Sequence, residues 1–525
     1  MASRNQEIQI FEKIQQELTS DGSLLYAGRL LQRASQKFPT HIALIEPNKS
    51  ITYKELYFRS LELSKTLKAA GVKAGDRVLL FSENSTVFYV AYFAIWQLGA
   101  VVVPLNTFLH ARELAHIITD STPGLIFSSC ALRESLEKLI TENFLTKLPE
   151  IITEEAIDWT TEIPTQLDRY AQDHDITPVT RSSELLCVLM YSSGTTGVPK
   201  GIMLSSKNIL SNTMQSYARF TISGQTDRER IFSVLPLFHV FAQHVCIWLP
   251  IMTGSSIIIV AKIDRKLILE GLEQKPTLFF GFPALYGLLC LMKTAPLDSI
   301  KMFVSGADML PDKIRAGFAM IYGRKISSGY GLSEASPVVG VNHENEEEPT
   351  NVIGHPLVGI ECEIRDENEQ PVPSGTIGTL WLRGDNIMMG YYNSPESTAT
   401  VLKNGWLNTG DLGSIDKLGK VAIRGRSKDL IIHKGFNIYP AEIENVLMRH
   451  PAVFKAAVIG QPEPMSGEVP VAFVAVRNKQ TNLEELLRDL CSSNLAAYKI
   501  PRKFICLEDL PMNATGKIDK KQLHL

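Results

Sequence analysis

A short polar loop near the middle of the chain has the composition of a phosphate-binding site. The segment Tyr191–Gly201 reads YSSGTTGVPKG and carries glycine, serine, threonine and lysine but almost nothing that could pack a core. Backbone N–H groups of such a loop can converge on an anion, and hydroxyl groups and a lysine add donors. The kinase-type phosphate loop is excluded, because the residue five positions after Gly194 is Pro199 rather than glycine. The loop therefore predicts a site for a phosphate chain of another type.

Four further motifs follow this loop along the chain. They read SGYGLSEASP from Ser328, LNTGDLG from Leu407, GRSKDLIIHKGFNIYPAEIE from Gly425 and NATGKI from Asn513. In this order, and together with the loop, they resemble the signature of the adenylate-forming superfamily, which contains acyl-CoA synthetases, adenylation domains of peptide synthetases and luciferases. The resemblance covers nearly the whole chain.

The resemblance implies that the chain binds ATP and activates a carboxylic acid. The acid is first joined to AMP with release of pyrophosphate, and the acyl group then passes to a nucleophile, usually a thiol. Donors in the loop would stabilise the charge of the departing pyrophosphate. The loop residues implied to contact or surround the phosphates are Ser192, Ser193, Gly194, Thr195, Thr196, Gly197 and Lys200.

The later motifs are implied to hold the rest of the nucleotide and a metal ion. Tyr330 would stack on adenine, and Ser333, where the family usually has threonine, would bind the α-phosphate. Glu334 would be a ligand of Mg²⁺, because a hard cation prefers carboxylate and phosphate oxygens. The two glycines Gly306 and Gly331 are implied to lie at the same cofactor site.

Two charged residues are implied to contact the ribose. Asp411 in TGD would accept hydrogen bonds from both ribose hydroxyls, and Arg426 would make a second contact with ribose or phosphate. The alternative interpretation is that Asp411 belongs to a turn, since Gly410 and Asp411 are also typical turn residues.

Four residues are implied to take part in the two half-reactions or in the switch between them. Lys517 would bridge oxygens of the substrate carboxylate and the α-phosphate and so offset their repulsion. Lys428 matches the hinge about which the C-terminal domain rotates in the family, and Gly435 lies on the face that then admits the thiol, where glycine lets a pantetheine arm pass close to the backbone. His239 matches a residue that closes and opens the acyl pocket, although a lone histidine among apolar residues can equally be a core residue.

The stretch PLFHVFA around His239 bears on the substrate. It carries no carboxylate that could meet a substrate ammonium group, so a plain carboxylic acid is expected. The other segments implied to line the acyl pocket are mostly apolar and small, which suits an alkyl chain. A medium- or long-chain fatty acid is therefore the first candidate, and aryl acids stay open because such a pocket also accepts flat rings.

The acceptor of the acyl group is predicted to be coenzyme A, the commonest in the family. The alternative is the phosphopantetheine arm of acyl carrier protein, which relatives with similar motifs use. Two other hypotheses are an isolated adenylation module and a nucleotide-sensing protein without activity. The intact Lys517 and Glu334 argue against the last of these.

The elements that must position these residues alternate between strand and helix. Thr52 precedes Glu55 by three residues, which predicts a capping box and a helix that ends near Gly71. Strands are expected at DRVLLFS and AVVVPL, with a helix at VFYVAYFAIWQLG between them. This alternation continues to about residue 340 and predicts a doubly wound α/β architecture.

The pattern of predicted helices and strands changes twice more along the chain. Short β-rich pieces separated by turn residues predict a small β subdomain at about 350–427. Mixed helix and strand patterns then predict a small, mobile α+β domain over residues 428–525, so that residues 1–427 form the ATP- and acyl-binding domain.

The length, net charge and cysteine content of the chain limit the class of protein and its cellular location. Its 525 residues require at least two domains, and a net charge of −3 argues against nucleic-acid binding. The 7 cysteines contain no CxxC pair, which fits a reducing compartment, so a cytoplasmic location without a signal peptide is expected. The apolar run VCIWLPIMTGSSIIIVA from Val245 predicts a buried helix, a turn and a strand rather than a membrane span.

Overall fold

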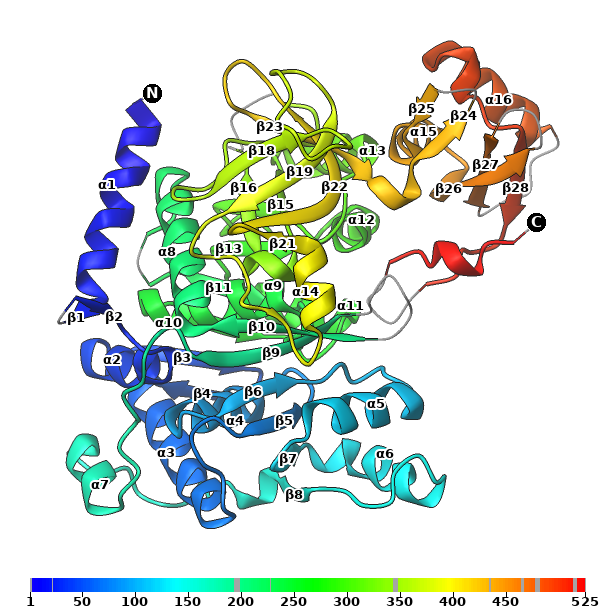
Figure 1. The fold of residues 1–525 in the computed structure, drawn as a ribbon. Helices are drawn as coiled ribbons and strands as arrows, with labels where there is room; N and C mark the ends of the chain where they lie inside the picture. Colours follow the sequence, from blue (N-terminus) through cyan, green and yellow to red (C-terminus); the bar gives the residue numbers. More distant parts are fainter. Residues whose placement is uncertain are drawn as a thin grey trace.

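The computed structural model of the chain describes residues 2–20, 22–192, 199–226, 228–342, 348–433, 436–463, 467–476, 482–512 and 517–524. These residues form a large body and a smaller body beside it, and the smaller one holds the C-terminal part of the chain (Figure 1). The large body combines two α/β sheets with an antiparallel sheet, which confirms the predicted fold class.

The first sheet of the large body has the strand order β20-β10-β9-β6-β5-β7-β8. Its central strands β9, β6, β5, β7 and β8 are parallel, whereas β10 is antiparallel to β9. Helices α5 (Ala111–Ser121) and α6 (Cys130–Thr141) cover one face with apolar side chains. The strands are β5 (Arg77–Phe81), β6 (Val101–Pro104), β7 (Leu125–Ser128), β8 (Glu150–Thr153), β9 (Leu186–Ser192), β10 (Lys200–Ser205) and β20 (Gly390–Tyr391).

The second sheet has the order β16-β15-β14-β13-β11-β12-β3-β4 and is parallel from β15 to β3. Helices α11 (Arg265–Glu273), α12 (Pro283–Met292) and α13 (Asp312–Tyr322) cover its outer face. The strands are β3 (Ile42–Glu46), β4 (Lys49–Thr52), β11 (Arg230–Ser233), β12 (Ser256–Ile259), β13 (Leu278–Gly281), β14 (Met302–Ser305), β15 (Ser327–Gly331) and β16 (Val338–Val341).

Helix α4 (Thr86–Gln97) lies between these two sheets and is buried along its length except at the partly exposed Val87. The hydroxyl of Tyr89 donates to the carbonyl of Cys246 at 3.1 Å, in a segment beside the second sheet. The indole N–H of Trp96 donates to the carbonyl of Cys187 on β9 at 3.0 Å, in the first sheet. The apolar helix that the sequence pattern predicted between the two strands is therefore present, and it packs against both sheets.

The helix predicted after Thr52 is α3 (Tyr53–Ala69), and half of its expected capping box is present. The Thr52 side chain accepts a hydrogen bond from the Glu55 backbone N–H at 3.2 Å. The Glu55 carboxylate lies instead 3.7 Å from Arg59, one turn further along. The remaining helices of the large body are α1 (Ala2–Glu17), α2 (Leu30–Lys37), α7 (Leu167–Asp173), α8 (Ser206–Ile222), α9 (Val240–Gln243), α10 (Leu249–Thr253) and α14 (Pro395–Val401).

The apolar run from Val245 folds as its sequence predicted. It forms most of a π-helix, η3 (His244–Trp248), then α10, a turn at Gly254 with φ 71°, and the buried strand β12. Within the residues that the structure describes, no helix combines the length and apolarity needed to span a bilayer.

The third sheet is antiparallel and spans the region where the β subdomain was expected. Its order is β17-β23-β22-β19-β18, and β21 pairs with β22. The strands are β17 (Val352–Gly354), β18 (Glu361–Arg365), β19 (Gly378–Arg383), β21 (Leu402–Lys403), β22 (Trp406–Ile415) and β23 (Val421–Arg426).

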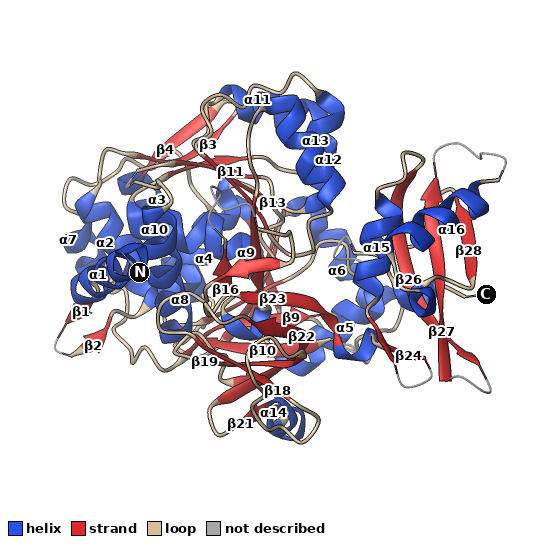
Figure 2. Ribbon diagram, turned by 90° about the horizontal axis from the view of Figure 1, so that it is seen from above, coloured by secondary structure: helices blue, strands red, loops and turns tan. Residues whose placement is uncertain are grey.

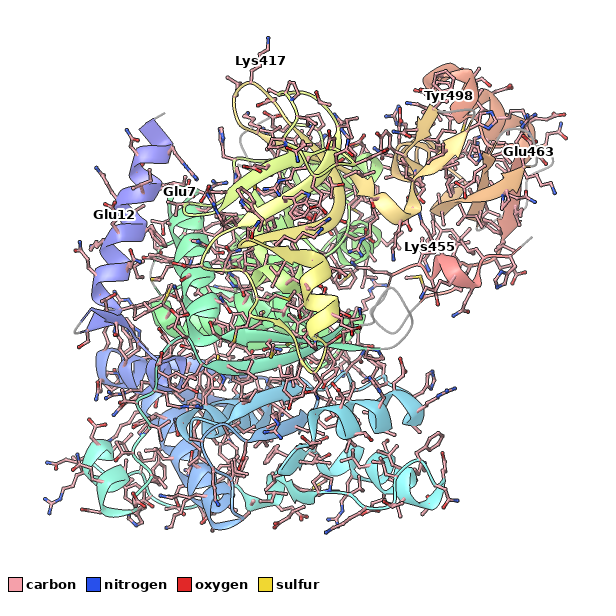
Figure 3. The ribbon with its side chains drawn as sticks, in the orientation of Figure 1. Glu7, Glu12, Lys417, Lys455, Glu463 and Tyr498 are labelled. Atoms are coloured by element: carbon pink, nitrogen blue, oxygen red, sulfur yellow. The ribbon has the colours of Figure 1, made fainter. Side chains whose placement is uncertain are left out.

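Helix α1, which precedes these sheets, is held against α8. The Glu7 carboxylate lies 3.2 Å from the Arg219 guanidinium, and both side chains are buried. Glu7 is labelled on α1 in Figure 3. The hairpin of β1 (Thr19–Ser20) and β2 (Ser23–Leu24) follows α1.

The smaller body has its own sheet and core. Its sheet runs β25-β24-β27-β26, with β28 pairing to β27, and α15 (Pro440–Met448) and α16 (Leu483–Asn494) pack on one face (Figure 2). The strands are β24 (Ile431–His433), β25 (Phe436–Ile438), β26 (Val453–Glu463), β27 (Gly467–Val476) and β28 (Lys503–Leu507). The predicted boundary at Lys428 falls on the short helix η5 (Ser427–Asp429) between β23 and β24, and its role as a hinge stays a prediction.

Candidate active site

Predicted site residues from three strands meet at one end of the second sheet. Tyr330 stands near the end of β15, and its hydroxyl donates to Asp411 Oδ2 on β22 at 2.5 Å. Arg426 Nε lies 3.2 Å from the other carboxylate oxygen, Oδ1. The carboxyl ends of parallel strands are where α/β sheets bind ligands, so this cluster is the centre of the candidate site.

The strand register explains why Asp411 and Arg426 meet. They are direct cross-strand partners in the antiparallel pair β22–β23. Preceding side chains fix the local turn: Thr409 Oγ1 accepts from the Asp411 backbone N–H at 3.0 Å, and Asn408 Oδ1 accepts from that of Gly410 at 2.9 Å. The turn interpretation and the binding interpretation of Asp411 are therefore compatible.

Burial dominates the electrostatics of this carboxylate. Asp411 is only 5% exposed, and its burial raises its pKa above the ordinary aspartate value, while the charge of Arg426 acts in the opposite direction. Both carboxylate oxygens already accept hydrogen bonds or face a cation, so the group is prepared to receive neutral hydroxyl donors without an uncompensated charge.

Glu334 is held on the short helix η4 (Ser333–Ala335), directly after β15. Its Oε1 accepts from the hydroxyl of Tyr391 at 3.0 Å, and its backbone carbonyl accepts from the Met388 N–H at 2.8 Å. Burial raises the pKa of the Glu334 carboxyl, and the Tyr391 hydrogen bond opposes that shift. A half-buried carboxylate with one side-chain donor is a fitting ligand for a cation that takes its other oxygens from a substrate.

Tyr391 is a site residue that the sequence did not reveal. Its ring centroid lies 5.4 Å from Lys200 Nζ, and its hydroxyl reaches Glu334, so it links the end of the phosphate loop to the predicted metal ligand. Lys200 Nζ also donates to Ser397 Oγ at 3.1 Å. The signal in the sequence is weak, because only the pairing of β10 with β20 brings Tyr391 into place.

Lys517 comes from the far end of the sequence and lies close to the cluster. Its charge acts on the pKa of Asp411 and on that of His239, which burial and then Lys517 lower to about 4. His239, which precedes α9, is therefore neutral at pH 7. The charge of the predicted catalytic lysine thus reaches both the predicted pocket histidine and the aspartate predicted to bind ribose.

Gly306 and Gly331 lie where the backbone or a ring comes very close. A Cβ at Gly306 would lie 3.1 Å from the Phe241 ring, and a Cβ at Gly331 would lie 2.0 Å from the carbonyl oxygen of Pro337. The latter distance excludes any other residue unless the backbone moves, so Gly331 is required by packing as well as by its predicted role.

The remaining predicted residues are spread more widely. Ser192 ends β9, Ser333 begins η4 and Lys428 is exposed on η5. No group of three His, Cys, Asp or Glu side chains in the described part of the chain could form a protein-only metal site. The predicted positions that lie outside the described residues are Ser193, Gly194, Thr195, Thr196, Gly197 and Gly435.

The fold combines a doubly wound α/β core with a smaller C-terminal body, which is the architecture of the adenylate-forming enzymes. The profile of the family described as AMP-binding enzyme matches residues 31–392, and the profile of its C-terminal domain matches residues 442–517. The chain belongs to this family, and within it to the acyl-CoA synthetases.

The names of similar proteins refer to different carboxylic acids. A long-chain-fatty-acid–CoA ligase of Bacillus subtilis (strain 168) is 31% identical, covering 94% of this chain and 93% of its own length. A feruloyl-CoA synthase of an Amycolatopsis species is 32% identical, covering 94% and 97%. ATP-bound MatB from Rhodopseudomonas palustris has a TM-score of 0.83 at 29% identity over 94% and 97% of the two chains.

A second solved structure resembles this chain to the same degree. O-succinylbenzoate coenzyme A synthetase from Bacillus subtilis, in complex with ATP and a magnesium ion, has a TM-score of 0.83 at 27% identity and covers 94% and 99%. The similarity extends over both bodies in each comparison, so the chain spans nearly the whole length of these relatives.

Proposed function

We propose that the chain joins a carboxylic acid to AMP from ATP, releases pyrophosphate and transfers the acyl group to coenzyme A. The observation that carries this proposal is the position of Lys517: a residue from the last motif of the chain influences both Asp411 and His239 in the large body. This influence supports an arrangement in which the C-terminal body faces the proposed nucleotide site.

The nucleoside part of ATP would be held by the Asp411 cluster. Ribose hydroxyls can donate to the Asp411 carboxylate, and Tyr330 and Arg426 keep that carboxylate oriented before they arrive. A carboxylate positioned in advance loses little further freedom on binding, which favours affinity. The phosphates would lie toward Lys200, with Ser333 at the α-phosphate and the loop residues Ser192, Ser193, Thr195 and Thr196 as donors.

Mg²⁺ fits Glu334, the half-buried carboxylate whose only side-chain partner within the described residues is the Tyr391 hydroxyl. The ion would supply neutralisation of phosphate charge. The Tyr391 hydroxyl would orient the Glu334 carboxylate, and Lys200 Nζ lies 5.4 Å from the centroid of the same ring, so an anionic chain here would meet both a cation and a metal ligand.

Lys517 would act at the bond that forms. Attack of a carboxylate on an α-phosphate brings two anions together, and an ammonium group between them lowers the barrier because its charge is already in place. His239 is neutral and half-buried, so it adds no charge to this site and can serve as a steric wall of the acyl pocket.

The first candidate substrate is a medium- or long-chain fatty acid. This choice is supported by the relatives named long-chain-fatty-acid–CoA ligase and by the apolar segments expected to line the pocket. The second candidate is an aryl acid, supported by the feruloyl-CoA synthase relative and by a similar structure of an anthranilate CoA ligase. Coenzyme A is the proposed acceptor, with acyl carrier protein as the alternative, and the rotation about Lys428 that would bring Gly435 to the thiol is part of the same proposal.

One assay separates these possibilities. Purified protein with ATP and Mg²⁺ is offered a panel of C2 to C18 acids, benzoates and cinnamates, and pyrophosphate release is followed with either coenzyme A or acyl carrier protein present. Acid-dependent pyrophosphate release with thioester formation on coenzyme A supports the proposal. Release without thioester on coenzyme A, together with acylated carrier protein, would favour the alternative acceptor.

A further inference from the structure

A cavity of about 720 Å³ lies between the two bodies, and none of its lining residues belongs to the candidate active site. Small-molecule sites in proteins have volumes of about 300–1,000 Å³, so the cavity is large enough for a ligand. The large body contributes α13, residues 348–351 and β23, and the smaller body contributes α15 and the short helix η6 (Ala497–Lys499). A ligand in this cavity would therefore contact both bodies at once.

Three arginines on the walls of the cavity have too few counter-charges. Arg315 on α13, Arg424 on β23 and Arg449 directly after α15 all line it. Two of them share one carboxylate, because Asp312 Oδ1 lies 3.7 Å from Arg315 and Asp312 Oδ2 lies 3.9 Å from Arg449. Arg424 is exposed, and no carboxylate of the described residues forms an ion pair with it. Like charges that converge repel one another, so an anion would complete this wall.

The other two carboxylates that line the cavity are already paired elsewhere. Glu442 lies 2.7 Å from Lys499, and Glu348 forms an ion pair with Lys420. These pairs neutralise the two lysines and leave the arginines uncompensated. The cavity therefore has an excess of positive charge that comes from both bodies.

The type of cation indicates the chemistry of the ligand. A guanidinium group is a planar donor that can make two parallel hydrogen bonds to a phosphate. Three such groups, arriving from different elements, suit a ligand with several anionic oxygens along its length, as in a diphosphate, better than a single carboxylate. Tyr439 also lines the cavity and offers an aromatic ring beside these charges, so both an inorganic diphosphate and a nucleoside diphosphate match the walls.

We propose that this cavity binds a small molecule with a diphosphate group, held by Arg315 and Arg424 of the large body and Arg449 of the smaller one, and that the bound anion holds the two bodies together. The bound anion replaces repulsion across the interface with attraction. Its effect on the reaction rests on the proposed function: it would favour adenylate formation and slow the acyl transfer that requires the C-terminal body to rotate, since a ligand favours the arrangement that binds it better.

Isothermal titration calorimetry of the full chain without metal ions tests the binding step. Inorganic pyrophosphate and GDP are the titrants, and they distinguish an inorganic source of the diphosphate from a nucleotide. The protein carries Lys200→Ala, which weakens the proposed phosphate loop as a competing site. Adding Arg424→Ala or Arg449→Ala is expected to weaken binding of at least one titrant by about tenfold or more, the effect of losing a charge-assisted hydrogen bond.

A matched variant separates this site from general charge attraction. Arg169→Ala removes an arginine on α7 whose side chain is 75% exposed, and it should leave binding unchanged. Arg424 is exposed and the Arg449 side chain is 47% exposed, so both cavity variants should fold, as thermal unfolding would verify. The inference is overturned if neither titrant binds, or if Arg169→Ala weakens binding as much as Arg424→Ala does.

Kinetics test whether the anion holds the two bodies together. Acyl transfer from supplied acyl-adenylate to coenzyme A is measured in the Lys200→Ala protein with the titrant that binds more tightly. Methylenediphosphonate replaces pyrophosphate, because pyrophosphate would convert acyl-adenylate back to ATP. Transfer should slow by about tenfold at saturation, which corresponds to about 1.4 kcal/mol, and Arg424→Ala should abolish the effect. Binding without any slowing would overturn the proposed effect on the two bodies. Absence of acyl transfer without titrant would contradict the proposed function and leave the binding result intact.

Discussion

At the scale of single residues, the site depends on side chains whose charges are modified by their surroundings. Asp411 and Glu334 are both carboxylates whose burial raises their pKa values. Both accept a hydrogen bond from a tyrosine hydroxyl, but only Asp411 also faces a guanidinium, that of Arg426. The environment of Asp411 suits hydroxyl donors of a ribose, and that of Glu334 leaves room for a cation. The two environments therefore favour different ligands for the same chemical group.

The charge of Lys517 is the residue-scale feature with the clearest consequence. Lys517→Ala should reduce acyl-adenylate formation by roughly 10²–10³-fold, the usual loss for one preorganised charge contact, and should largely spare thioester formation from supplied acyl-adenylate. Because Lys517 also lowers the pKa of His239, that pKa should rise in the variant, as measured by NMR titration of the ring. Equal loss in both half-reactions, with no change at His239, would contradict the assigned role.

The proposed role of Glu334 leads us to expect that kcat/KM for ATP depends on pH. Only the ionised carboxylate can hold Mg²⁺, and burial raises its pKa above the ordinary value of 4.5. The kcat/KM for ATP should therefore fall as the pH is lowered through a midpoint above 4.5. The stability contribution has the opposite sign: the fold favours the protonated group, so this term is present at low pH and is lost as the pH rises through the raised pKa.

Varying the Mg²⁺ concentration tests whether Glu334 causes this loss of activity at low pH. Protons and Mg²⁺ compete for the same carboxylate, so a higher Mg²⁺ concentration should move the midpoint to lower pH. If the midpoint did not change with the Mg²⁺ concentration, the loss of activity at low pH would come from the protonation of another group.

At the scale of elements, the backbone around β15 is constrained by close approach. Gly331→Ala would place a Cβ 2.0 Å from the Pro337 carbonyl oxygen, between two backbone segments. We expect a loss of about 1–3 kcal/mol in the free energy of unfolding, the usual effect of overpacking, together with reduced activity because Glu334 follows directly. Thermal unfolding and pyrophosphate release measure the two effects.

A matched glycine on α13 shows what the same change does elsewhere. A Cβ at Gly317 would meet its nearest neighbour, Cys290 Sγ, at 4.0 Å, which is ordinary contact. Gly317→Ala should therefore leave stability unchanged or raise it by up to about 1 kcal/mol, as alanine in a helix does relative to glycine. Equal destabilisation by both substitutions would show that the contact with Pro337 is not decisive.

The elements also show what could be predicted from sequence and what could not. Local patterns predicted α3, α4, β5 and β6 because each carries its own periodicity and caps. The family motifs indicated Asp411 and Glu334, but the partner of Glu334 was missed, since Tyr391 reaches it only through the non-local pairing of β20 with β10. The half-formed capping box at Thr52 has a local cause instead, because Arg59, one turn further along α3, lies 3.7 Å from the Glu55 carboxylate. Only the contact through the pairing of β20 with β10 is long-range, and such a contact leaves no spacing in the sequence.

At the scale of the whole molecule, polar contacts hold the C-terminal body in the arrangement in which the charge of Lys517 acts on Asp411 and His239. Lys313 Nζ, at the start of α13, donates to the carbonyls of His450 and Val453 at 3.0 and 3.2 Å. The neighbouring Asp312 accepts from Asn445 at 3.2 Å and faces Arg449 at 3.9 Å. A cavity of about 720 Å³, lined by both bodies, lies beside these contacts. An interface of this kind, polar and incompletely filled, favours separation without a large loss of buried apolar surface.

Lys313→Ala should therefore shift the balance between the two proposed arrangements. Losing these hydrogen bonds should cost about 1–2 kcal/mol, which changes a two-state equilibrium about 5–30-fold. Acyl-adenylate formation should slow by up to that factor, because Lys517 is presented less often. Thioester formation from supplied acyl-adenylate should be unchanged or faster, and single-turnover kinetics of the two half-reactions would measure both. Lys325→Ala removes an exposed lysine shortly after α13 and is the matched control, expected to change neither rate. If Lys313→Ala slowed both half-reactions alike, or behaved as the control does, these contacts would not govern the arrangement of the two bodies.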